Sequence, residues 1–166
     1  SFVLRDGLKE TFNGLVEDIN ADTDVQVRGV TEFSETDFQD DPLIDASVLE
    51  TVRGVDGVAE AIGGTGFDGI IPVRSNGEPM ETFGPPLFGF NYVDSPLSPT
   101  FLSEGSAPGQ GEFVMDLDTA ANEDFVIGET YDVIFPNGTE SFRLSGLVSF
   151  GEDNATLGAV ITLYNE

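Results

Sequence analysis

Carboxylates are the reactive side chains that this sequence holds in large number. It contains 31 Asp and Glu residues against 6 Lys and Arg residues, and it has neither His nor Cys. The lack of imidazole and thiol groups excludes Ser-His-Asp and Cys-His nucleophilic sites, paired-His zinc sites and thiolate metal sites. Two carboxylates could still serve as the acid and the base of a glycosidase. With 31 acids in the chain, the composition favours no particular pair.

Two acidic groups have a partial resemblance to calcium ligands, because Ca²⁺ prefers several carboxylate oxygens. Asp37, Asp40 and Asp41 lie close together, but their spacing matches no known calcium loop. Asp116 and Asp118 begin like such a loop, and the later ligands and glycine are missing. Solvated acidic surface explains both groups, so we predict no metal site.

The remaining chemical candidates are equally weak. The glycine-rich residues 63–66 lack the Lys and the strand–turn–helix context that a phosphate-binding loop needs. The single Lys of the chain, Lys9, lies among charged residues and is a poor Schiff-base candidate. We therefore expect a protein that is not an enzyme, with no catalytic residue and no cofactor-binding residue.

The charge balance restricts the class of partner. A net charge of −25 repels the phosphates of DNA and RNA, and it also repels anionic lipid headgroups. A solvated acidic shell that keeps the protein soluble is the simplest interpretation. Adaptation to high salt and attraction of a cationic partner are the alternatives that the composition leaves open.

The length suits one domain with a sizeable core. A chain of 166 residues should bury roughly 70% of its unfolded surface, so it needs no disulfide. No run approaches the roughly 18 apolar residues of a membrane-spanning helix, and no signal-peptide pattern opens the chain. Because the sequence begins without Met, we expect it to be a segment of a longer polypeptide.

Apolar spacing predicts two helices in the first third of the chain. An apolar stripe of helical period runs through residues 2–20 and comprises Leu4, Leu8, Phe12, Leu15 and Ile19. A second helix is expected over residues 46–53, with Asp45 as N-cap and Gly54 as the stop. Its apolar residues Val48, Leu49 and Val52 should face inward.

The rest of the sequence alternates in the manner of strands. The expected strands are 24–30, 58–62, 67–73, 87–93, 113–115, 131–135, 141–150 and 157–163. Asn-Gly pairs at 76–77 and 137–138 predict hairpin turns, and Gly146 predicts a bulge or a close backbone approach. Asp118 is the expected N-cap of a short helix over 119–124. Together these elements predict an α+β fold with a mixed or antiparallel sheet and one or two short helices on one face.

Phe88, Phe90 and Tyr92 should point to one face of the strand over 87–93. An aromatic row of this kind usually belongs to a core. The alternative is an exposed face that binds a partner or a ligand.

One family resemblance is carried by residues 101–151. The order is Leu102-x-Glu104-Gly105, a Pro/Gly loop, Glu112-Phe113-Val114-Met115-Asp116, Gly128-Glu129 and Phe142-x-Leu144-x-Gly146-Leu147. It resembles the extracytoplasmic domain of MacB-type, FtsX-like ABC transporter permeases, which lies between the first two transmembrane helices in that family. Two departures are Gly105-Ser106, where the family often has Gly-Arg, and Gly128-Glu129, where it has Gly-Asp.

The resemblance implies a division of the chain. Residues 1–75 would form a membrane-proximal, porter-like βαβ part with a stalk-like N-terminal helix, and residues 76–150 an inserted β-rich subdomain. Residues 151–166 would return a strand to the first part. A second βαβ-like half that normally follows in the family is missing.

The implied function is a non-catalytic coupling domain on the extracytoplasmic side of a cell membrane. Its partners would be a cytoplasmic ATP-binding subunit, reached through a transmembrane part, and a second permease copy or an extracytoplasmic protein. The alternative is a sensor that binds a peptide or a lipid-like molecule, with Phe88, Phe90 and Tyr92 in the site. A free-standing β-rich enzyme is a more distant alternative.

Overall fold

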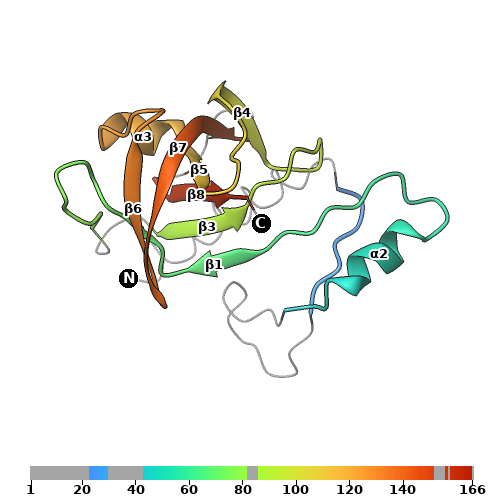
Figure 1. Cartoon of the computed structure of the whole chain (residues 1–166). Coiled ribbons are helices and arrows are strands. Elements are labelled where there is room, and N and C mark those ends of the chain that lie inside the picture. The colour runs from blue at the N-terminus through green and yellow to red at the C-terminus, as the bar shows by residue number, and fades with distance from the viewer. Residues whose placement is uncertain (1–22, 30–42, 82–85, 152–155, 157, 166) are drawn as a thin grey trace, which may run out of the picture.

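The computed structural model describes residues 23–29, 43–81, 86–151, 156 and 158–165. These residues form an eight-stranded mixed sheet with two short helices, so the predicted α+β class is confirmed (Figure 1). The helices are α2 (Ser47–Arg53) and α3 (Leu117–Asn122). The strands are β1 (Gly66–Asp68), β2 (Ile71–Pro72), β3 (Leu87–Asn91), β4 (Thr100–Gly105), β5 (Glu112–Asp116), β6 (Thr130–Phe135), β7 (Gly138–Phe150) and β8 (Val160–Tyr164).

The strand order shows how distant parts of the chain meet. Seven strands follow the order β1-β3-β8-β5-β7-β6-β2, and β4 pairs with β7 off this path. The pairs β3–β8 and β5–β7 are parallel, and the other pairs are antiparallel. The sheet takes strands from each of the expected segments 1–75, 76–150 and 151–166. The division into separate parts stays a prediction.

The core lies on both faces of the central strands. On β5, Phe113 and Met115 enter one buried cluster, and Val114 enters the other. The neighbouring β8 alternates in the same way, since Val160 belongs to the first cluster and Ile161 to the second. Successive side chains of a strand point to opposite faces, so a strand buried on both sides needs apolar residues at nearly every position.

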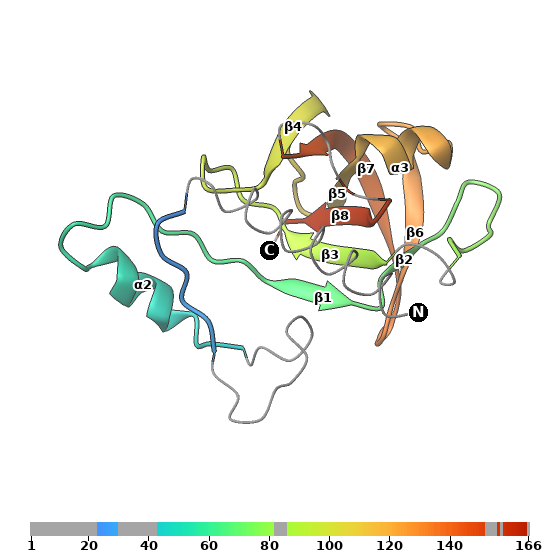
Figure 2. The same cartoon turned by 180° about the vertical axis from the view of Figure 1, so that it is seen from behind.

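A crossover unit occupies the centre of the sheet. The chain runs from β5 through α3 and β6 into β7, and β5 and β7 then lie parallel to each other. Parallel neighbours cannot be joined by a tight hairpin, and here α3 and β6 supply the connection. Figure 2 shows α3 at the upper end of the sheet, beside β6 and β7.

The helix α2 agrees with the predicted range but contributes little to the core. Ser47–Arg53 ends at Gly54, as expected, and none of its residues is buried. Ala46 is the N-cap, while Asp45 accepts a hydrogen bond from the backbone N–H of Ser47 at 2.8 Å. Figure 1 shows α2 away from the sheet, which explains why its apolar side is only half-buried.

Three strand predictions need correction. Residues 24–29 have no regular structure, and the side chains of Val25 and Val27 are exposed. Residues 58–62 are also irregular, and the single strand expected over 67–73 is divided into β1 and β2. Alternating apolar residues form a strand only where a neighbouring strand accepts the backbone and a core accepts one face.

The turn and cap predictions are partly correct. Asn76-Gly77 lies in a turn, with Gly77 at a φ of 84°. The second hairpin loop is Pro136-Asn137, because Phe135 already pairs with Gly138. The N-cap of α3 is Asp116 rather than Asp118, so this helix begins two residues earlier than expected.

The amphipathic helix expected over residues 2–20 lies outside the described residues. Within the part of the chain that the structure describes, no helix is both long and apolar enough to cross a membrane.

Gly146 confirms the predicted irregularity of the return strand. The register between β5 and β7 shifts so that Phe113 pairs with Leu144 and Val114 with Gly146, which leaves Ser145 as the bulged residue. A Cβ at position 146 would lie 2.6 Å from the carbonyl oxygen of Glu104. Only glycine allows β4 to approach β7 this closely.

We predict that Gly146→Ala destabilises the fold. The added methyl group would meet backbone carbonyl oxygens, which cannot move aside cheaply, so the cost should be about 1–3 kcal/mol. Urea denaturation followed by circular dichroism measures this change. The matched control is Gly64→Ala, whose Cβ would have no atom within 4 Å and should change stability by less than about 0.5 kcal/mol. Equal stability of the two variants would contradict the prediction.

Candidate functional site

Asp116 is the most strongly constrained ionisable group in the described residues. Its side chain is fully buried at the junction of β5 and α3. One carboxylate oxygen accepts the backbone N–H of Thr119 at 2.8 Å, and the other accepts the backbone N–H of Ile161 at 2.9 Å. Burial raises the pKa of Asp116, and these two N–H donors oppose the increase.

The contacts of Asp116 favour a structural role over a chemical one. Both oxygens are directed at backbone N–H groups, where they cap α3 and attach it to β8. Asp118, by contrast, is exposed. No group of three or more acidic residues within the described ranges is placed to hold a metal ion.

The predicted aromatic row lies on β3 and directly after it. Phe88, Phe90 and Tyr92 are all half-buried, and Phe90 and Tyr92 pack against the cluster that contains Val114 and Leu163. The rings of Phe88 and Phe90 are neighbours, with centroids 6.0 Å apart. The row therefore covers one face of the core with part of its surface left accessible.

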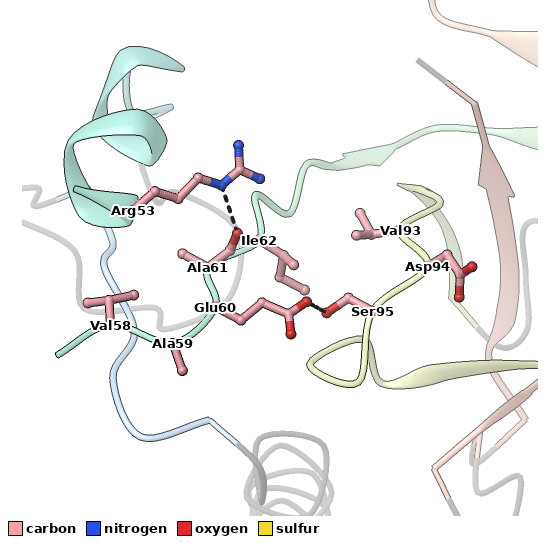
Figure 3. A pocket seen from close by; sticks show the side chains of 9 residues that line it. All are labelled: Arg53, Val58, Ala59, Glu60, Ala61, Ile62, Val93, Asp94 and Ser95. Carbon is pink, nitrogen blue, oxygen red and sulfur yellow. Dashed lines mark hydrogen bonds between the residues drawn. The ribbon is translucent and has the colours of Figure 1, made fainter. Parts of the chain in front are cut away.

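A cavity of about 380 Å³ lies beside this region and was not predicted from the sequence. It lies between the irregular residues 58–62 and the residues that follow β3 (Figure 3). Its walls are formed by Arg53, Val58, Ala59, Glu60, Ala61, Ile62, Val93, Asp94 and Ser95. No aromatic residue lines it, so the predicted aromatic row is not part of it.

Much of the polar lining of the cavity is engaged within the protein. Ser95 donates its hydroxyl hydrogen to Glu60, and Arg53 donates from Nε to the carbonyl oxygen of Ala61 at 3.1 Å (Figure 3). Arg53 also forms an ion pair with Glu50. The hydrogen bond between Ser95 and Glu60 links the two walls of the cavity.

The glycine-rich residues 63–66 occupy a connection rather than a phosphate-binding turn. Residues 63–65 are irregular and lead into β1, and no helix follows. Asn91 fixes this connection, because its side chain donates to the carbonyl oxygen of Gly63 at 3.0 Å and accepts from the backbone N–H of Thr65 at 2.7 Å.

A cluster of aromatic rings around Tyr164 was also not predicted. The Tyr164 ring stacks on Phe113 with centroids 5.9 Å apart, and Phe142 meets it edge-on at 5.1 Å. The Tyr164 hydroxyl is buried, and burial raises its pKa. The cluster joins β5, β7 and β8, so its role in the fold is packing.

Four residues considered at the sequence level, Lys9, Asp37, Asp40 and Asp41, lie outside the described residues. Comparison with models of known protein families and with curated protein sequences finds no match for this chain.

We predict that Asp116→Asn lowers the free energy of unfolding by about 1–3 kcal/mol. Asn is as good an N-cap as Asp, so the bond to Thr119 should survive. Asn has only one acceptor oxygen, and its NH₂ group would face the N–H of Ile161. Urea denaturation of Asp118→Asn is the control, with an expected change below about 0.5 kcal/mol. The interpretation is wrong if both variants unfold at the same urea concentration.

Proposed function

We propose that this chain is the extracytoplasmic domain of an ABC transporter permease and performs no bond-making chemistry. In this role it relays movement that ATP hydrolysis drives in a cytoplasmic subunit. The movement reaches a substrate or a partner protein outside the membrane. The order of motifs over residues 101–151 carries the proposal, since it resembles the corresponding domain of the MacB-type permeases.

The packing of that stretch supports a mechanical role. It provides β4 to β7, and β7, β4 and β6 are the three longest of the described strands. It also contains the buried residues Phe113, Val114 and Met115. Its motif residues serve the fold, because Asp116 attaches α3 to β8 and Gly146 allows two strands to approach. A continuous sheet with a core on both faces is suited to transmit displacement without bending.

The ligand-binding alternative has less support. A sensor for a peptide or a lipid-like molecule would need an open apolar cleft lined by Phe88, Phe90 and Tyr92. These residues are half-buried, and the cavity beside them has other, mostly small or polar, walls. The aromatic row therefore resembles the edge of a core more than a binding groove.

The location can be tested by cysteine labelling, because the chain contains no Cys of its own. Ser75 lies exposed in the turn that contains Gly77. In the full-length gene product, Ser75→Cys should react with a membrane-impermeant maleimide equally well in intact and in lysed cells.

The control is Ser98→Cys, at a position that is 7% exposed and should react only after denaturation. Labelling of Ser75→Cys only after lysis would overturn the proposal. So would a parent gene without membrane-spanning segments on both sides of this chain.

The absence of ATP chemistry can be tested with the isolated chain. Titration with Mg-ATP in a calorimeter should give no more heat than dilution, because nucleotide binding is assigned to the separate subunit. A saturable heat signal would contradict the proposed division of labour.

A further inference from the structure

The strand β4 (Thr100–Gly105) has one edge that no described strand covers. It pairs with β7 alone. β5 lies on the opposite side of β7, since β4 and β5 both pair with the same part of that strand, including Gly146. Figure 1 shows β4 at the top of the sheet, projecting beyond the other strands. Among the described strands that end the sheet, β1 and β2 are only 3 and 2 residues long, whereas β4 has 6 residues.

Two apolar side chains of β4 are exposed to solvent. Phe101 is 48% exposed and Leu102 is 41% exposed. Successive residues of a strand point to opposite faces, so these two side chains flank the open edge on both sides. A strand added along β4 would cover both of them.

The backbone of β4 provides the other half of a binding surface. In an antiparallel pair, every second residue directs its N–H and C=O groups away from the partner strand. Such groups are a template for a further strand, and extended peptides bind many proteins in this way. Pro99 and the register shift between Leu102 and Glu104 limit the regular edge to a short segment, so the added strand would pair over few residues.

Charge decides between the possible occupants of this edge. A second copy of the chain would bring a net charge of −25 against an equal charge, and Glu104 is exposed on β4 itself. Repulsion between two such copies opposes self-pairing, and the same negative charge attracts a cationic partner.

We propose that the open edge of β4 binds an extended segment of a partner protein in which basic and apolar residues alternate. The apolar residues would lie on one face and contact either Phe101 or Leu102. The aliphatic stems of the basic residues would cover the other side chain, with their charged ends against the acidic surface. This inference specifies the extracytoplasmic partner of the proposed function. Because it depends on the open edge of β4 and on the charge of this chain, it can be tested on the isolated chain whatever the location experiment shows.

The test uses the whole chain and a fluorescent synthetic peptide, Lys-Val-Lys-Phe-Lys-Val-Lys. Fluorescence anisotropy should show binding, and NMR should show amide shifts concentrated on β4. The double variant Phe101→Ser with Leu102→Ser should bind at least about tenfold more weakly, because two apolar contacts are lost. Raising the salt from about 0.05 to about 0.5 M should also weaken binding, since screening reduces the attraction.

Two controls separate strand pairing from general attraction to an acidic surface. Val126→Ser removes an apolar residue that is 52% exposed and lies outside β4, and it should leave binding unchanged. A peptide with the same charge but Pro in place of Val should bind much more weakly, since Pro lacks the N–H that a strand needs. Equal binding of both peptides, or of the double variant and the wild type, would overturn the proposal. A dimer of the chain that the double variant abolishes would also overturn it, in favour of a second copy as the occupant.

Discussion

The buried carboxylate of Asp116 is the contact on which the centre of this structure depends. It ends β5, caps α3 and accepts a hydrogen bond from Ile161 on β8, so one side chain joins three elements. A charge away from water is costly unless hydrogen bonds replace its hydration. The cost is met here by two backbone N–H groups, which require β8 to lie beside β5. The position of the last strand is thereby tied to the crossover between β5 and β7.

The rest of the acidic surface has the opposite character. Among the acidic residues of the described part, Asp116 is the buried one. Exposed ion pairs such as Arg143 with Glu112 contribute little to stability, and they are few beside a net charge of −25. Stability therefore comes from the apolar clusters on the two faces of the sheet. The acidic shell affects solubility and the choice of partners, which is why an open strand edge in this protein favours a cationic occupant.

The sequence predicted the elements that have a local signature. The alternation in β3, β6 and β7 and the apolar run in β5 were recognised, and the glycine at 146 correctly indicated a bulge and a close approach. The strands expected over 24–30 and 58–62 were wrong for the residues that the structure describes. An alternating pattern shows only that one face of a segment is apolar, and it does not show that a neighbouring strand pairs with the segment. Asp118 was the expected N-cap, whereas the N-cap in the structure is Asp116. Its inward direction depends on the amide of Ile161, 45 residues away.

The amino-acid sequence by itself determined the excluded chemistry, since no fold can supply imidazole or thiol groups that the chain lacks. It also determined the net charge of the protein and which segments form most of the strands. Only the tertiary structure decided that β8 lies between β3 and β5, that residues 58–62 and 93–95 line one pocket, and that β4 keeps an open edge. These features arise from pairing between distant segments. The free energy of such pairing depends on which surfaces meet, and a local pattern does not record that.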